Sequence, residues 1–231
     1  MSLGFSPDEW MAIRLSLTVA ARAVAFGLPL ACLMAVLLSR GRFPGRALLD
    51  VIVHLPLVLP PVVVGWLLLL VFGLRGPIGA MLHDWFGVRL VFSTAGAALA
   101  CATMSFPLMV RAIRLSLDAI DPGLIDAART LGASTWDRLF SIVLPLALPG
   151  IVVGAVVAFA ASLGEFGAVI TFAANIPGQT QTLPLAIYSA LQTPDGDAVA
   201  ARLSLVSVAL AVTGLLISEY LGRRLRARLG R

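Results

Sequence analysis

The chain has 231 residues, of which 59% are hydrophobic and 13% charged, and its mean hydropathy is +0.98. Because so few polar residues cannot cover the surface of a soluble particle of this size, the composition excludes an ordinary soluble domain and predicts an integral membrane protein. All 17 basic residues are arginines, set against 12 acids. In a membrane protein the placement of the charged residues indicates the orientation in the membrane. The excess of arginine therefore gives no reason to expect nucleic acid as a partner.

Five apolar runs follow one another along the chain, each near or above the length that a helix needs to cross about 30 Å of hydrocarbon. They cover residues 15–38, 51–74, 91–110, 143–173 and 203–221. We therefore expect an all-α integral membrane protein with five transmembrane helices, or six if the fourth run is broken. The expected organisation is an extracytoplasmic segment at 1–14, a transmembrane domain at 15–222 and a basic cytoplasmic tail at 223–231.

The arginines alternate between the two sides of these runs. Twelve lie in segments that would share one side, and four lie in segments on the other, namely Arg14, Arg75, Arg89 and Arg202. The positive-inside rule then predicts a multi-pass protein of the cytoplasmic membrane, with its N-terminus outside and its C-terminus in the cytoplasm. We expect no removable signal peptide, because an acidic segment precedes the first run and no small-residue cleavage pattern follows it.

Two of the runs contain residues that interrupt helices. Pro56, Pro60 and Pro61 lie in the second run, where each removes a backbone donor. A proline-kinked helix packed in the bundle and a helix that lines a cavity or pathway both remain open for this stretch. The fourth run would make a helix of roughly 45 Å, which is too long for one span. Gly164 and Gly167 flank Glu165 inside it, so we expect a break there and a second helical or re-entrant piece at 166–173.

A charged island between the third and fourth runs predicts two short helices outside the bilayer. Asp121 and Pro122 favour a helix start, and Gly132 can end that helix in a left-handed conformation. Ser134 then begins a second helix with Asp137 three residues later, a spacing typical of a capping box. The positive charges around it place this island in the cytoplasm.

The island also resembles the cytoplasmic coupling loop of ABC importer permeases. The motif of that family is matched at Ala127, Ala128, Gly132, Phe140, Ile142, Leu144 and Pro145, and it departs at one position, where Asp126 replaces the usual Glu. The resemblance implies the type I ABC importer permease fold, with a coupling loop at about 111–143 that docks into an ATP-binding subunit. Since Asp keeps the charge and loses a methylene, the departure affects the fine fit to that partner more than the role.

Further stretches resemble the molybdate permease subunits within that family. They are H-L-P-L-V-L-P-P-V-V-V-G from His54, M-S-F-P-L-M-V-R-A-I-R from Met104, S-L-G-E-F-G-A from Ser162 and N-I-P-G-Q-T-Q-T-L-P from Asn175. Sulfate permeases share the outline, in particular the Gly-Glu-aromatic-Gly core. The resemblance therefore implies import of molybdate, with tungstate as the close analogue, and a sulfate or thiosulfate importer is the alternative.

The resemblance implies a complex of two copies of this chain, two cytoplasmic ATP-binding subunits and an extracytoplasmic molybdate-binding protein. The chain has no G-x-x-x-x-G-K-[ST] phosphate loop, so we expect it not to be an enzyme and expect ATP and magnesium to bind to the partner subunits. The implied mechanism is alternating access. Besides protein partners, we expect membrane lipid to contact the basic tail.

Candidate pathway or gate residues are Pro60, Pro61, Ser162, Glu165, Thr171 and Asn175. A carboxylate at membrane depth is costly, but a bare one would repel an anionic cargo, so we favour Glu165 as an acceptor that holds the broken helix in shape. The neutral donors of Ser162, Thr171 and Asn175 suit transient contact with an oxyanion, although hydroxyls in membrane helices often bond their own backbone. We expect no metal site, because the two cysteines and two histidines are isolated from one another.

Two other classes of protein remain as alternatives. An intramembrane enzyme would need converging catalytic groups, and neither H-E-x-x-H nor G-x-S-x-G occurs in the sequence. A stand-alone channel would leave the charged island without an explanation.

Overall fold

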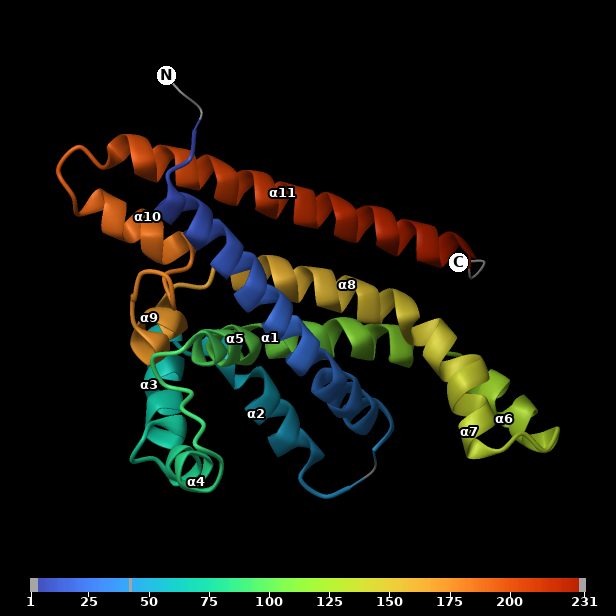
Figure 1. Cartoon of the computed structure of the whole chain (residues 1–231). Helices are drawn as coiled ribbons and strands as arrows, with labels where there is room; N and C mark the ends of the chain where they lie inside the picture. Colours follow the sequence, from blue (N-terminus) through green and yellow to red (C-terminus); the bar gives the residue numbers. More distant parts are fainter. Residues whose placement is uncertain (1–3, 42, 229–231) are drawn as a thin grey trace.

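The computed structural model describes residues 4–41 and 43–228, and this part of the chain contains helices and no strands. The predictions for residues 1–3, Arg42 and residues 229–231 lie outside it. The elements, labelled in Figure 1, are α1 (Pro7–Arg40), α2 (Arg46–Val58), α3 (Pro61–Phe72), α4 (Pro77–Phe86), α5 (Thr94–Asp118), α6 (Pro122–Thr130), α7 (Thr135–Arg138), the π turn η1 (Leu139–Val143), α8 (Leu144–Leu163), α9 (Gly167–Ala173), α10 (Leu183–Leu191) and α11 (Asp197–Arg228).

Four helices in the described part of the chain are long and apolar enough to cross a membrane. They are α1, α5, the continuous helix from Thr135 to Leu163 and α11. All four extend beyond the predicted apolar runs into polar residues. α1 begins at Pro7 because Ser6 and Glu9 form a capping box, and α11 begins at Asp197. The predicted all-α membrane architecture is confirmed.

The second apolar run forms two helices joined at a sharp angle. α2 ends at Val58, α3 begins at Pro61, and their axes are bent by 118°. Leu59 precedes a proline and is extended, with φ −75° and ψ 144°, because the ring that follows disfavours helical backbone. Pro56 stays inside α2, so the break comes from the Pro60–Pro61 pair. This run is therefore a broken pair, more sharply bent than the kinked helix that was one of the two interpretations left open, and the pathway-lining interpretation stays a prediction.

The fourth run is broken where the sequence predicted. α8 ends at Leu163, and α9 starts at Gly167, one residue from the expected position. At its other end α8 continues without interruption through the π turn into α7, so this helix begins well before the apolar run. The charged island and the fourth run thus share one continuous helix.

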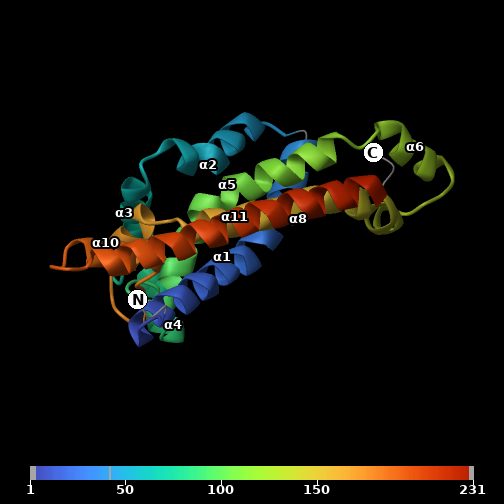
Figure 2. The ribbon, with the colours of Figure 1, turned by 90° about the horizontal axis from the view of Figure 1, so that it is seen from above.

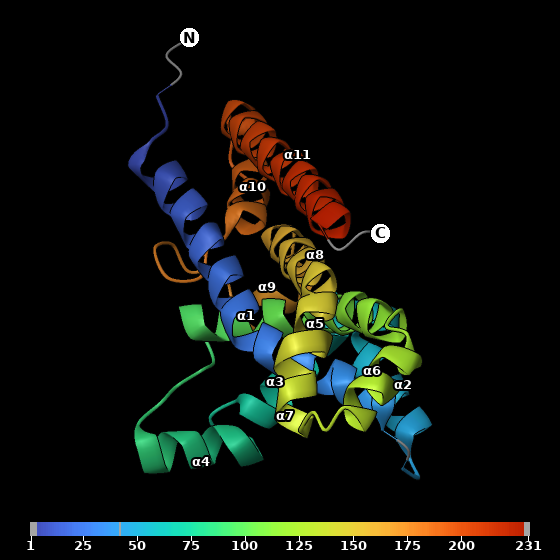
Figure 3. The ribbon, with the colours of Figure 1, turned by 90° about the vertical axis from the view of Figure 1, so that its right-hand side faces the viewer.

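The helices are arranged so that the beginning of α1 and the end of α11 lie at opposite ends of the molecule. Figure 1 shows α6 and α7 at the same end as the last turns of α11, while the first turns of α1, α9 and α10 lie at the other. Figure 2 shows the same separation from above. In Figure 3, α4 lies to one side of the bundle, beyond α3. The island and the break in the fourth run are therefore far apart.

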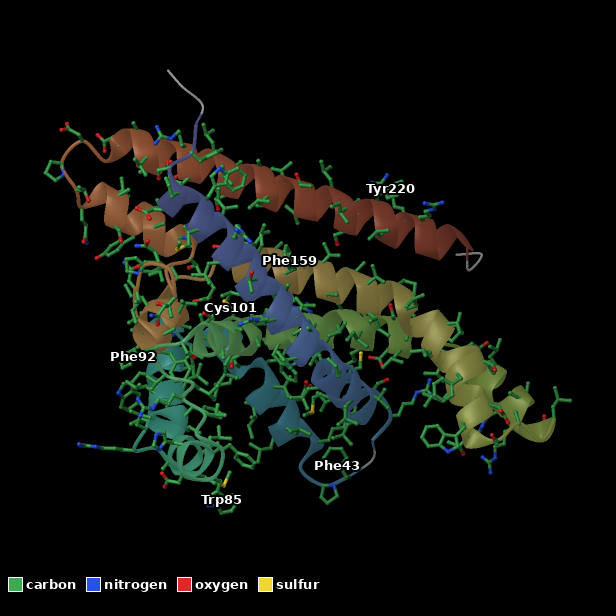
Figure 4. All side chains as sticks on the ribbon, in the orientation of Figure 1. Phe43, Trp85, Phe92, Cys101, Phe159 and Tyr220 are labelled. Carbon is green, nitrogen blue, oxygen red and sulfur yellow. The ribbon has the colours of Figure 1, made fainter. Side chains whose placement is uncertain are left out.

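Small residues allow the central helices to pack closely. A Cβ at Gly154 of α8 would lie 3.3 Å from the Ala112 side chain and the Met109 backbone of α5, and Gly27 of α1 also faces Met109. Cys101 is fully buried inside the bundle, whereas Trp85 and Tyr220 lie on its periphery (Figure 4). Close backbone approach through small residues is the usual way in which helices associate in membranes.

Candidate functional site

The first helix of the island is capped at its start as the sequence predicts. The Asp121 carboxylate accepts a hydrogen bond from the Gly123 backbone N–H at 2.8 Å, and Pro122 occupies the first helical position. The cap satisfies one of the free donors of the first turn, and the proline lacks a donor that would otherwise need a partner. α6 therefore starts at a fixed point, with its N-cap three residues after the end of α5.

Gly132 ends α6 in the left-handed conformation. Its φ is +85°, and two backbone bonds close the turn, from Ala133 N–H to the Ala128 carbonyl at 3.0 Å and from Gly132 N–H to the Arg129 carbonyl at 3.1 Å. This pair of bonds is a Schellman motif. No atom lies within 4 Å of a Cβ added at Gly132, so the backbone angle, and not crowding, requires glycine here.

The second helix of the island starts with the predicted capping box. The Ser134 hydroxyl accepts from the Asp137 N–H at 3.1 Å, and the Asp137 carboxylate accepts from the Ser134 N–H at 3.1 Å and from its hydroxyl at 2.6 Å. α7 then passes into the π turn, in which the Leu144 N–H reaches back five residues to the Leu139 carbonyl. Because Pro145 follows, one backbone donor is already missing at this point.

Large apolar side chains of the island are exposed. The exposed fractions are 88% for Leu131, 69% for Trp136 and 59% for Phe140. The rings of Trp136 and Phe140 are stacked, with centroids 6.1 Å apart and an angle of 19° between their planes. An exposed aromatic pair beside a further apolar side chain is typical of a protein interface.

The motif residues are distributed along this exposed surface. Asp126, Ala127 and Gly132 are exposed and Ala128 is half-buried on α6 and its turn, while Phe140, Ile142, Leu144 and Pro145 follow one another through the π turn into α8. Ile125 and Leu139 pack against the core and attach the island to the bundle. The structure thus brings the eight motif positions together at one end of the molecule.

Three of the candidate pathway residues meet where α3 crosses α9. A Cβ at Gly167 would lie 2.7 Å from the Pro61 side chain, and one at Gly65 would lie 2.8 Å from both the Ala168 carbonyl and the Thr171 side chain. Glu165 is half-buried beside this crossing, and its carboxylate accepts from the Ala168 N–H at 2.9 Å. It therefore satisfies a backbone donor in the first turn of α9; backbone was one of the two kinds of donor expected for this carboxylate, the other being a neighbouring arginine.

The hydroxyl and amide groups of this region are mostly turned toward the protein itself. The Thr171 hydroxyl donates to the Gly167 carbonyl at 2.8 Å, and the Asn175 amide donates to the Ser189 hydroxyl at 2.7 Å. The Ser162 hydroxyl is buried and has no hydrogen-bond partner among the described residues. Ser162 and Asn175 lie outside the α3–α9 crossing, so the six candidates do not form one cluster.

Sequence reasoning missed two structural features near the candidate site residues. Leu131 and Trp136 are the most exposed apolar residues of the island, and neither belongs to the family motif; an apolar residue inside a charged island was the available signal. The second feature is an ion network of Asp50, Arg114 and Asp118, which no local pattern indicates. In the described residues, no group of three or more His, Cys, Asp or Glu could hold a metal ion.

Residues 27–227 match the family described as binding-protein-dependent transport system inner membrane component. The chain belongs to this family. Among solved structures, a bacterial alginate ABC transporter chain superposes with a TM-score of 0.71 at 22% identity, covering 97% of this chain and 80% of that one. A chain of the MetNI methionine ABC transporter in an inward-facing conformation gives a TM-score of 0.66 at 18% identity, covering 94% of both. These likenesses show the fold.

Curated members of the family are more similar in sequence. The molybdenum transport system permease protein ModB of Escherichia coli K12 is 60% identical over 223 residues, which are 96% of this chain and 97% of that protein. ModB of Haemophilus influenzae is 53% identical, with the same coverage. The sulfate transport system permease protein CysT of E. coli K12 is 38% identical over 98% of this chain and 79% of its own length.

Proposed function

We propose that this chain is the membrane-spanning permease of an ATP-driven importer that carries molybdate across the cytoplasmic membrane. The observation that carries the proposal is the coupling island, a capped and exposed helix pair that holds the family motif at one end of a membrane bundle. The cargo rests on the 60% identity, over nearly both full lengths, to a molybdenum transport permease. Tungstate, the close chemical analogue, is expected to share the route.

The proposed complex contains two copies of the chain, two cytoplasmic ATP-binding subunits and an extracytoplasmic molybdate-binding protein. Its nucleotide chemistry belongs to the ATP-binding subunits, which hold ATP and magnesium, since the present chain contains no lysine and hence no phosphate loop. The exposed Leu131, Trp136 and Phe140, with Asp126 beside them, supply the contact with those subunits. The chain itself is a transport subunit without enzymatic activity.

In the proposed topology the chain crosses the membrane five times, with the bent pair α2–α3 as one of the crossings. The N-terminus lies outside, and the island lies in the cytoplasm with the C-terminus, a placement supported by the arginine distribution and by the opposite positions of the start of α1 and the end of α11 (Figure 1). ATP binding draws the coupling helices together and switches the bundle to the outward-facing state. Hydrolysis then resets it, and molybdate passes beside the α3–α9 crossing.

Uptake of labelled molybdate into vesicles tests this proposal directly. The vesicles contain the chain with its ATP-binding subunits and binding protein, and tungstate and sulfate are added as competitors in parallel. We expect ATP-dependent uptake that tungstate inhibits and sulfate does not. Saturable uptake by this chain alone, without ATP or the ATP-binding subunits, would refute the proposal.

Sulfate is the second candidate cargo, because the chain is also 38% identical to a sulfate permease over nearly all its length. Sulfate and molybdate are both tetrahedral oxyanions, so the same membrane architecture serves either. ATP-driven uptake of labelled sulfate, with no uptake of molybdate, would keep the importer and change its cargo.

A further inference from the structure

An ion network joins the cytoplasmic ends of three helices. One terminal nitrogen of Arg114 on α5 lies 3.1 Å from each carboxylate oxygen of Asp50 on α2. The Nε of Arg114 lies 3.5 Å from Asp118, one turn later on α5, and Asp118 also accepts a hydrogen bond from the Ser39 hydroxyl of α1 at 2.5 Å. The network lines a cavity of about 450 Å³. It connects α1, α2 and α5 at one level.

α2 has little other attachment to the bundle. Val53 is the one buried residue of this fully described helix, and Leu48, Val51, Ile52, Leu55, Leu57 and Val58 are all exposed. Because apolar packing of α2 against α5 is slight, the contact between Asp50 and Arg114 is the main polar restraint on the position of α2. The two side chains are partly shielded from solvent, with exposed fractions of 37% and 26%.

The same network lies directly beside the coupling island. α5 ends at Asp118, and the N-cap of α6, Asp121, follows three residues later. Ile120, between the two helices, is buried in the core and holds this junction in place. A movement of α6 therefore displaces the end of α5, and with it the Arg114 side chain.

Asp50, the other partner in the ion pair, lies on the helix that is connected through α3 to the candidate pathway residues. Asp50 lies about 12 Å from the end of α2, at 1.5 Å per residue, and the Pro60–Pro61 break follows. α3 then packs on α9 so closely that a Cβ at Gly65 or Gly167 would meet atoms of the facing helix within 3 Å. A displaced α2 therefore moves α3 against α9.

We propose that Arg114 is a positioning residue that links the coupling helices to the broken helix pair α2–α3, by holding Asp50 while the permease switches. This inference rests on the proposed function and adds the route by which movement of the coupling island reaches the pathway. The contacts on the route are α6 to the end of α5, Arg114 to Asp50, and α3 to α9. Loss of the ion pair leaves nucleotide hydrolysis intact and separates it from transport.

The test compares molybdate uptake with ATP hydrolysis in the assembled complex, reconstituted in vesicles with its ATP-binding subunits and binding protein. In Arg114→Met, which keeps most of the apolar stem and removes the charge, we expect molybdate transported per ATP hydrolysed to fall by about fivefold or more. ATP hydrolysis stimulated by the loaded binding protein should stay within about twofold of wild type. An unchanged ratio of transport to hydrolysis in Arg114→Met would overturn the proposal.

Arg111→Met is the matched control. Arg111 lies on the same helix and lines the same cavity, but it is exposed and makes no ion pair within the described part of the chain. Its replacement should leave the ratio at the wild-type value. An equal loss in Arg111→Met would assign the effect to the general charge of the cavity and would count against the specific pair.

Two further variants separate coupling from folding. Asp50→Asn removes one charge at nearly constant shape, and it supplies the same comparison if Arg114→Met does not assemble. The exchanged pair Asp50→Arg with Arg114→Asp should transport more molybdate per ATP than either of its two single variants. A purely structural role would lower the amount of assembled complex without changing this ratio, and an exchanged pair no better than its singles would refute the link.

The wild-type complex distinguishes this inference from the proposed function. If wild type shows no ATP-driven molybdate uptake, the proposed function fails and the positioning role falls with it. If wild type transports molybdate and the Arg114 and Asp50 variants do so at the same yield per ATP, the positioning role alone is refuted.

Discussion

Glu9 and Arg202 are 193 positions apart in the sequence, and two hydrogen bonds of 3.0 and 2.8 Å join the Arg202 guanidinium to one oxygen of the Glu9 carboxylate. The other carboxylate oxygen accepts from the Ser6 backbone at 2.6 Å. Glu9 is 4% exposed, so its charge is satisfied almost entirely by these contacts. This ion pair connects the beginning of α1 to the beginning of α11.

Replacement of Glu9 tests how much this ion pair contributes to the stability of the chain. In Glu9→Gln the acceptor loses its charge, so the ion pair with Arg202 is lost and only hydrogen bonds from the charged guanidinium to a neutral oxygen can remain; we expect a loss of about 2 kcal/mol in unfolding free energy. Thermal unfolding of the detergent-solubilised chain measures it. Asp8→Asn is the control, since Asp8 is the exposed neighbouring acid. Equal unfolding temperatures for Glu9→Gln and wild type would show that the pair adds no net stability.

Gly132→Val should uncouple transport from ATP hydrolysis. A β-branched side chain at φ +85° costs roughly 1–2 kcal/mol, which distorts the turn between α6 and α7. Gly132→Asn should be milder, because Asn tolerates the left-handed region. ATP-driven molybdate uptake by the assembled complex is the measurement. Normal uptake in a stably assembled Gly132→Val complex would contradict the importance of this turn.

Reversal of the charge at Asp126 should weaken binding of the ATP-binding subunits. Asp126 is exposed on α6 within the family motif, so Asp126→Arg is expected to affect association without changing the fold of the island. Asp126→Glu restores the residue that the family usually has and should bind at least as well as wild type. Co-purification of the subunits with each variant gives the answer, and unchanged assembly with Asp126→Arg would remove this residue from the interface.

Trp136 should contribute more to that interface than its place outside the motif implies. The side chain is 69% exposed and stacked on Phe140, so Trp136→Ala should hardly change the stability of the chain. We expect it to weaken binding of the ATP-binding subunits by about tenfold or more, as for an aromatic anchor. Trp10→Ala, at the opposite end of the molecule and 52% exposed, serves as the control. Equal affinities in titrations of the two variants would exclude Trp136 as an anchor.

One added methyl group at the α3–α9 crossing should destabilise the protein. A Cβ at Gly65 would come within 2.8 Å of backbone and side-chain atoms of α9, so Gly65→Ala should cost about 1–3 kcal/mol. Gly164→Ala is the matched control, since the nearest atom to its Cβ would be 3.8 Å away. Thermal unfolding compares the two. A Gly65→Ala protein as stable as Gly164→Ala would show that the crossing can open without cost.

The features that the sequence predicted well are local ones. The caps at Asp121 and Ser134 and the turn at Gly132 depend on residues within five positions of each other, so local sequence patterns predict them. The break near Glu165 was likewise predicted from local sequence, by the glycines on either side.

The features that the sequence did not predict depend on distant contacts. Three prolines indicated an interruption of the second run, but its position after Val58 and its 118° angle were not predicted, since they depend on the fold around it, including the packing of α3 against α9 at Gly65 and Gly167. Asp50 and Arg114 are 64 positions apart, and each alone looks like a charge at the end of a membrane helix. The six pathway candidates were chosen by residue type, which does not determine whether their side chains meet.

The π turn between α7 and α8 has a consequence for how the island can vary. Such a turn holds one residue more than α-helical geometry, and each residue advances a helix by about 100°. The stripe of side chains that contains Trp136 and Phe140 is therefore out of phase with the stripes of α8 that pack in the membrane. One continuous helix thus carries two independent faces, and residues that suit a partner protein can change without altering those that suit the bundle.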